Sequence, residues 1–381
     1  MMSVWGVRVL FGTLGAVFGS WAVRIPDIAA NTGISSSTLG VVLLVLAAGS
    51  LVGMPVSGVV LARCSLRLAA AIFATYLVVA LVAIAASHWT GYVFVMAFAL
   101  GLGNGVYGIV INTSATHLEH ALGRSIVPSC HAAFSVATLA ASVLGGVAIG
   151  AGLTPVWHML IVAVAVGAPS LACVRWVPSA PQPEAFRFPR PRSLLVWIAS
   201  GVAFTALFAE GVITDWSAFF LQHEVLGGPH PQQAWGYSFF AVAIACGRGF
   251  GGALITRIGE RRVLLLCLAA ALGGYVVVVT AVALPVALVG FACVGLGLSN
   301  IYPCMISVAA RGIPAEQRQD AVASVSSIGY FGFLLGPAAI GGLSGALGIR
   351  DSLISPIVIL ACGAVGIVYL VRRPNPSAAP G

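Results

Sequence analysis

The chain has 381 residues, of which 60% are hydrophobic and only 7% are charged. Soluble domains carry about 25% charged residues, so this composition excludes an ordinary soluble enzyme. The net charge of +8 comes from 18 basic residues, all of them Arg and nearly all in short loops between apolar runs, and it does not indicate a nucleic-acid-binding protein. Twelve spans would use roughly 250 residues and leave no room for a large soluble domain.

Apolar runs separated by charged residues or by Pro and Gly clusters predict membrane spans. In chain order these spans cover 5–30, 37–61, 68–87, 91–116, 126–150, 155–177, 194–221, 232–256, 263–282, 286–310, 321–343 and 353–371. The segment at 178–192, PSAPQPEAFRFPRPR, is too rich in Pro and polar residues for a span and predicts a cytoplasmic linker. We therefore expect a six-span half at 1–177, the linker at 178–192 and a second six-span half at 193–381.

The arginines are distributed unevenly between the two sides of the membrane. With a cytoplasmic N-terminus, 15 Arg fall on the cytoplasmic side, Arg350 and Arg24 fall on the other side, and Arg248 lies within a span. Such an excess of Arg in cytoplasmic loops sets the orientation of a membrane protein. We expect both termini to be cytoplasmic, the protein to lie in a bacterial-type plasma (inner) membrane, and the chain to be a monomer.

The two halves repeat at an offset of 194 residues. Five pairs of residues match at this one offset: Gly58 with Gly252, Arg63 with Arg257, Gly101 with Gly295, Gly103 with Gly297, and Arg124 with Arg318. Parallel six-span repeats joined by a basic linker are the architecture of the major facilitator superfamily. We therefore expect an all-α integral membrane fold of twelve helices in two six-helix pseudo-symmetric halves.

Four stretches resemble a particular branch of that superfamily. They are FGSWAVRIPDIA at 18–29, INTSATHLEHALGRSIVPSCHAAFS at 111–135, EGVITDWSAFFL at 210–221 and IGYFGFLLGPAAIG at 328–341. Together they are similar to the MosC-like branch, which is related to rhizopine-transport proteins and loosely to fucose permeases. The resemblance implies a transporter and covers nearly the whole chain, and its motifs do not specify a substrate.

Charged residues inside a span must face a partner or a watery cavity, because a charge near the bilayer centre costs on the order of 3 kcal/mol. Glu210 lies about 4 Å outside the midplane of its span and Arg248 about 6 Å inside the midplane of the next span. The two are expected to pair, with Glu210 as a proton carrier. A pair that only holds spans 7 and 8 together is the alternative, and His131 is the alternative proton site.

Polar side chains near the midplane predict a substrate site. Asn104 and Tyr107 lie in span 4, Asn300 in span 10 and Tyr330 in span 11. Amides and phenols suit hydroxyl-rich or amine-bearing solutes, and sites of this superfamily lie at the interface of the two halves. The alternative is that these groups form hydrogen bonds between helices, worth about 0.6 kcal/mol each.

An outer gate is the third prediction. Arg24 and Asp215 carry opposite charges at about 10 Å and about 11 Å outside the midplane of the equivalent spans 1 and 7. Trp21 and Trp216 flank them at nearly equivalent positions. The competing accounts are a local pair between Arg24 and Asp27, and anchoring of both tryptophans at the membrane interface.

These observations favour a secondary transporter over an enzyme or a receptor. We expect a proton-coupled carrier whose partners are a small polar solute, such as a sugar-like or inositol-like compound, and protons, within the lipid bilayer. An exporter of small amphipathic compounds or drugs is the alternative. Neither a cofactor nor a metal is expected, because His117, His120, His223 and His230 offer too few ligands together.

Overall fold

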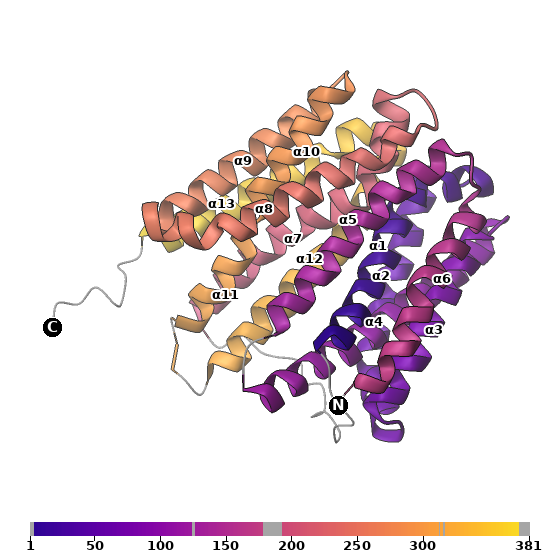
Figure 1. Cartoon of the computed structure of the whole chain (residues 1–381). Helices are drawn as coiled ribbons and strands as arrows, with labels where there is room; N and C mark the ends of the chain where they lie inside the picture. Colours follow the sequence, from indigo (N-terminus) through magenta and orange to yellow (C-terminus); the bar gives the residue numbers. More distant parts are fainter. Residues whose placement is uncertain (1–3, 124–125, 178–192, 312, 315–316, 373–381) are drawn as a thin grey trace. The chain divides into compact units, whose positions relative to one another are not determined.

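The structure is a computed structural model that describes residues 4–123, 126–177, 193–311, 313–314 and 317–372, so the linker predicted at 178–192 lies outside the described residues. The described chain is built from long helices (Figure 1). Twelve helical segments of the described chain are long and apolar enough to cross a membrane. The prediction of an all-α membrane fold with twelve spans is confirmed.

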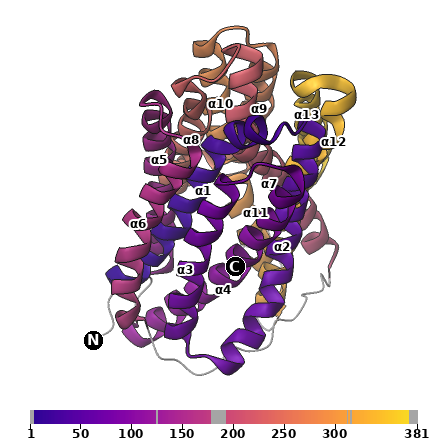
Figure 2. The ribbon, with the colours of Figure 1, turned by 90° about the vertical axis from the view of Figure 1, so that its right-hand side faces the viewer.

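The chain forms two compact units. The first unit contains six long helices, a short 3-10 turn (Val174–Trp176) and the segment Gly228–Ser238. Its helices are α1 (Val4–Thr32), α2 (Ser36–Arg63), α3 (Leu66–Ala85), α4 (Thr90–Leu122), α5 (Val127–Gly150) and α6 (Pro155–Cys173). Helix α1 packs on α5 and α6, and α2 packs on α4. Helix α3 also packs on α6, and α1, α3 and α6 run side by side in Figure 2.

The segment Gly228–Ser238 joins the first unit through hydrogen bonds, although it lies beyond 193 in the chain. It comprises a 3-10 turn (Pro231–Ala234) and the start of α8 (Trp235–Ile258). The Ser142 hydroxyl donates to the Ala234 carbonyl at 3.2 Å and contacts the Ser238 hydroxyl at 2.8 Å. The Gln233 amide donates to the Val23 carbonyl of α1. These bonds fix the start of α8 to α5 and α1.

The second unit begins with α7 (Leu194–Phe220), which continues into a π-helical turn (Leu221–Val225), and includes α8 from Phe239 onward. Its other helices are α9 (Glu260–Thr280), α10 (Leu284–Leu298), α11 (Ile301–Arg311), α12 (Arg318–Ser352) and α13 (Ile354–Arg372). Helix α7 packs mainly on α12 and also on α11 and α13, while α9 packs on α10. Helix α7 is therefore the central helix of this unit.

Close packing of α2 on α4 depends on four glycines. Gly49 and Gly53 of α2 and Gly101 and Gly105 of α4 each place their Cα against a backbone carbonyl of the other helix, so a Cβ at any of them would overlap that carbonyl. Both pairs have the small-xxx-small spacing that lets membrane helices approach closely. The same glycine spacing also permits Cα–H to carbonyl contacts.

Span 10 differs from its predicted form as one helix over 286–310. The structure divides it into α10 and α11, with a break at Ser299 and Asn300. Pro303 lies just after the break, where it has no N–H to donate to the carbonyl four residues earlier and its ring clashes with that carbonyl. The carbonyl of Ser299 is thereby released from the helical ladder.

Span 11 is longer than the prediction of 321–343. Helix α12 runs from Arg318 to Ser352, with a non-helical residue at Gly348, where φ is 79°. Small and apolar residues continue beyond 343, and a positive φ is readily adopted by glycine. The chain therefore turns at Gly348, where it presents Arg350 to the neighbouring helices.

Candidate functional site

Glu210 of α7 and Arg248 of α8 form an ion pair within the second unit, as their depths predicted. The Arg248 Nη2 lies 3.2 Å from Oε2 and 3.4 Å from Oε1 of Glu210. The side chains of Arg248 and Glu210 are 39% and 18% exposed. Because exposure of a charge to hydrocarbon is costly, the open side of this pair faces water.

The break in span 10 positions Arg248. The Nε of Arg248 donates to the Ser299 carbonyl at 3.4 Å. This is the carbonyl that Pro303 leaves without a helical donor. The guanidinium is thus held between a carboxylate on α7 and a main-chain acceptor at the end of α10.

Asn300 fastens the break to α8. Its amide nitrogen donates to the Gly247 carbonyl at 2.9 Å and to the Ser299 hydroxyl at 2.8 Å, and the residue is 7% exposed. Gly251 leaves room for the amide oxygen, which a Cβ there would overlap. The role of Asn300 in substrate binding stays a prediction, while its observed bonds are those of the interhelical alternative.

Two phenols lie near the ion pair. Tyr330 of α12 is 50% exposed, and Tyr302 of α11 donates from its hydroxyl to the Ser326 hydroxyl at 3.1 Å. Both phenols interact electrostatically with Glu210 and Arg248. We did not predict Tyr302 or Ser326 from the sequence. The available signal was Pro303, and it was not specific, because Pro55 and Pro169 also lie inside predicted spans and their helices continue past them.

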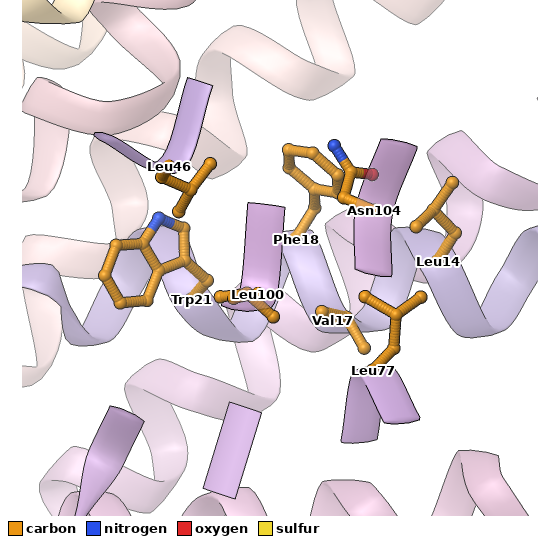
Figure 3. Close-up of a pocket in the computed structure, with 8 residues that line it drawn as sticks. All are labelled: Leu14, Val17, Phe18, Trp21, Leu46, Leu77, Leu100 and Asn104. Atoms are coloured by element: carbon orange, nitrogen blue, oxygen red, sulfur yellow. The ribbon is translucent and has the colours of Figure 1, made fainter. Parts of the chain in front are cut away.

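The predicted substrate residues of the first unit face different neighbours. Asn104 donates to the Ser50 hydroxyl of α2 at 3.1 Å, whereas the fully buried Tyr107 donates to the Leu10 carbonyl of α1 at 3.2 Å. Asn104 alone of the two lines a small, mostly apolar cavity (Figure 3). Its other lining residues are Leu14, Val17, Phe18, Trp21, Leu46, Leu77 and Leu100. The cavity volume of about 20 Å³ suits a water molecule rather than a solute.

His131, the alternative proton site, lies on α5. Its ring meets the ring of Phe11 edge to face, with centroids 5.0 Å apart. The Ser135 hydroxyl donates to the His131 main-chain carbonyl rather than to its imidazole. Residue 131 is exposed. The use of His131 as a proton site stays a prediction.

Arg24 is buried in the first unit with three partners. Its Nη1 donates to the Asp27 carboxylate at 2.7 Å and its Nη2 to the Leu153 carbonyl at 2.8 Å. Its Nε donates to Nδ1 of His158, the third partner, at 3.2 Å. The local pair with Asp27 is therefore present. Pairing with Asp215 stays a prediction, because Arg24 and Asp215 belong to different units.

The two tryptophans predicted at the outer gate are buried within their own units. Trp216 is fully buried and donates from its indole nitrogen to the Pro337 carbonyl of α12 at 2.9 Å. Trp21 is 3% exposed. Neither indole is exposed at a helix end, as anchoring at the membrane interface requires.

Arg350 holds three segments of the second unit together. Its Nε and Nη2 donate to the carboxylate and the main-chain carbonyl of Glu224, at 3.1 and 3.0 Å. Its Nη1 donates to the carbonyls of Val279 and Ala281, each at 2.7 Å. The guanidinium also lies over the ring of Phe220, 5.3 Å from its centroid. Arg350 thus binds the end of α12 to the ends of α7 and α9.

The predicted gate can be tested against the local pair. If Asp215 takes Arg24 from Asp27 when the outer mouth closes, Asp215→Asn should favour outward-open states and increase labelling of cysteines placed along the outer third of spans 1 and 7. Asp27→Asn is the matched control, and the background should lack the 8 native cysteines. Increased labelling in Asp27→Asn alone would show that only the local pair matters.

Comparison with known proteins identifies the family. The chain is 31% identical over 344 residues to an uncharacterized transporter of the Major Facilitator Superfamily type from Yersinia pestis, an alignment that covers 88% of this chain and 87% of the relative. The chain belongs to the Major Facilitator Superfamily. The sequence model of the Major Facilitator Superfamily also matches residues 198–381. Proteins of this superfamily are transporters rather than enzymes, and they bind small-molecule substrates within the membrane.

Further relatives agree with this assignment. The membrane protein MosC of Rhizobium meliloti is 28% identical over 380 residues, covering 96% of this chain and 90% of MosC. The expected resemblance to the MosC-like branch of the superfamily is confirmed. The nucleoside transporter NupG has the same fold, with a TM-score of 0.74, 14% identity and coverage of 98% of this chain and 100% of NupG. A bacterial homolog of the human lysosomal transporter Spinster also has a TM-score of 0.75, at 16% identity and 98% coverage of each chain.

Proposed function

We propose that this superfamily member is a proton-coupled secondary transporter that moves a small polar organic solute, such as a sugar-like or inositol-like compound, by alternating access. Glu210 carries the proton and Arg248 is its partner. The protein acts as a monomer in a bacterial-type inner membrane, with both termini in the cytoplasm, where most of its arginines lie.

The observation that carries this proposal is the partly exposed ion pair between Glu210 and Arg248. Nη2 of Arg248 donates to both carboxylate oxygens of Glu210, so the proposed protonation of Glu210 requires that Arg248 be drawn away. The contact is made by Nη2 alone, and both side chains are partly exposed. A movement of Arg248 toward another partner is therefore sufficient to release the carboxylate for protonation.

The groups around the pair favour a polar solute over the alternative of an amphipathic compound. The phenols of Tyr302 and Tyr330 and the hydroxyl of Ser326 are hydrogen-bonding groups near the charges. An apolar compound would remove water from these groups without replacing the lost hydrogen bonds, which costs free energy. A hydroxyl-bearing solute replaces them.

The proposal is tested by substituting Glu210. A panel of sugars, polyols, inositols and inositol amines is first screened for compounds that raise the melting temperature of the purified protein. With a stabilising compound, proteoliposomes of Glu210→Gln should retain counterflow, which needs no net proton movement, and lose accumulation driven by a pH gradient.

Asp351→Asn is the control, because it removes an exposed carboxylate at the end of α12. It should leave both activities unchanged. Unchanged pH-driven accumulation in Glu210→Gln would overturn the proton-carrier role. A fall in melting temperature together with loss of counterflow would indicate that the pair only holds α7 and α8 together.

A further inference from the structure

We propose that the site around Arg248 selects solutes that carry one negative charge and several hydroxyls, as the sugar acids do, and that it binds such a solute together with the proton on Glu210. This inference rests on the proposed function and specifies its substrate class. Four features of the site support it.

The guanidinium of Arg248 has one open edge. The Nε of Arg248 is used by the Ser299 carbonyl, and Nη2 is shared between the two oxygens of Glu210. Within the described residues, Nη1 has no hydrogen-bond partner, and the side chain is 39% exposed. The fork formed by Nη1 and Nη2 matches the two oxygens of a carboxylate. Arg248 can thus receive a second carboxylate while Ser299 still holds its Nε.

The charge balance of the site favours an anionic solute. With Glu210 ionised, the pair has no net charge, and with Glu210 protonated the site has a charge of +1. A guanidinium within a membrane span is unfavourable when it has lost its counter-charge, even where water reaches it. A monoanion restores neutrality, whereas a neutral solute leaves the charge uncompensated and a cation adds to it. Protonation of Glu210 and binding of an anion therefore favour each other, and this coupling is reciprocal.

In the part of the chain that the structure describes, no other charge near the pair could balance the site. Among the described residues of the neighbouring helices, Arg311 is paired with Glu260 and Arg350 with Glu224. These pairs lie at helix ends, as do Arg318, Asp320 and Asp351 of α12 and Arg261 and Arg262 of α9. Asp215 of α7 lies five residues beyond Glu210, about 140° around the helix. The titratable groups that lie near the pair are the phenols of Tyr302, Tyr330 and Tyr275.

The hydroxyl groups of the site favour a solute that also carries hydroxyls. Tyr275 is not available, because its buried hydroxyl donates to the Ala209 carbonyl. Tyr330 is half exposed, and Tyr302 is joined to Ser326 by a single hydrogen bond. The Tyr330 hydroxyl can donate and accept, the Tyr302 hydroxyl can still accept, and the Ser326 hydroxyl can still donate, so together they match the hydroxyls of a polyol. A hydroxylated acid therefore fits the site better than a fatty acid.

The test compares acids with matched neutral compounds in binding measurements on the full-length purified protein at pH 5.5 and pH 7.5. The probes are D-glucuronate with D-glucose, D-gluconate with D-sorbitol, and D-glucosamine as a cation. We expect at least one acid to bind more tightly than its neutral counterpart, with an affinity that rises up to tenfold for each unit by which the pH falls, since one proton is taken up with each anion. Glu210→Gln, which cannot ionise, should bind that acid with the same affinity at both pH values.

Arg248→Lys keeps the charge and loses the fork, so it should weaken binding of the acid at least tenfold, whereas a purely structural Arg248 would leave the affinity unchanged and contradict the inference. If neither acid binds better than its neutral counterpart, or the affinity does not depend on pH, the inference is overturned. Proton-driven accumulation of D-glucose or D-sorbitol that Glu210→Gln abolishes would in that case leave the proposed function standing. Accumulation of an acid that Glu210→Gln does not affect would instead overturn the proposed function.

Discussion

Arg350→Ala should lower the free energy of unfolding by about 3 kcal/mol, the largest loss that we expect from any single substitution. Arg350 makes four hydrogen bonds, to the Glu224 carboxylate and to the carbonyls of Glu224, Val279 and Ala281. Alanine would leave the carboxylate unpaired and the carbonyls with fewer donors. Unfolding of the detergent-solubilised protein by denaturant, followed by tryptophan fluorescence, measures the loss.

Two controls show whether this loss comes from the hydrogen bonds. Arg350→Lys retains the positive charge, but an ammonium group lacks the planar fork that reaches the carboxylate and the carbonyls together. We therefore expect an intermediate loss of stability. Arg257→Ala removes an exposed arginine from the end of α8 and should change stability by less than about 0.5 kcal/mol. Equal losses for Arg350→Ala and Arg257→Ala would contradict the role assigned to Arg350.

Gly105→Ala should have the second largest effect, a loss of about 2 kcal/mol. A Cβ at this position would overlap the Ser50 carbonyl of α2, and a main-chain atom cannot move aside as a side chain can. The helices α2 and α4 would have to separate along their whole crossing. Because Asn104 donates to the Ser50 hydroxyl at the same crossing, the separation should also break that bond.

The matched control is Gly108→Ala, one turn further along α4. No atom lies within 4 Å of a Cβ built at Gly108, and alanine is favoured over glycine in helices. This substitution should leave the melting temperature unchanged or raise it. A loss in Gly108→Ala as large as in Gly105→Ala would mean that helix flexibility, rather than close approach, explains the glycines of α4.

Much of the fold could be predicted because a bilayer imposes a length and an apolar composition on each span. The ion pair of Glu210 and Arg248 could be predicted as well, because two opposite charges at similar depths on consecutive spans have few other partners. Depth alone was sufficient there, since a charge inside a span needs a partner whichever way its side chain points.

The environments of the uncharged residues could not be predicted from depth. Asn104 and Tyr107 are three residues apart and nearly at the same height, yet one bonds to α2 and the other to α1. The direction in which a side chain leaves its helix depends on how the helices are packed around it. An apolar span shows little hydrophobic periodicity, so the sequence contains no clear signal for that direction.

The break in span 10 was missed for another reason. Hydropathy averaged over a span does not respond to a single proline, whereas the hydrogen bond that Pro303 cannot make is a local property. Tyr302 was not predicted for the same reason, because its position beside the ion pair depends on where α11 begins. A proline does not by itself indicate a break, because Pro55 and Pro169 lie inside helices that continue past them.

The bonds of Arg350 have a consequence for the proposed proton-coupled cycle. Arginine does not lose its proton in proteins, and main-chain carbonyls do not titrate. Three of its four bonds are to main-chain carbonyls, so these three bonds persist when the medium is acidified. The joint between α7, α9 and α12 can thus remain closed throughout a cycle in which protons bind and leave elsewhere.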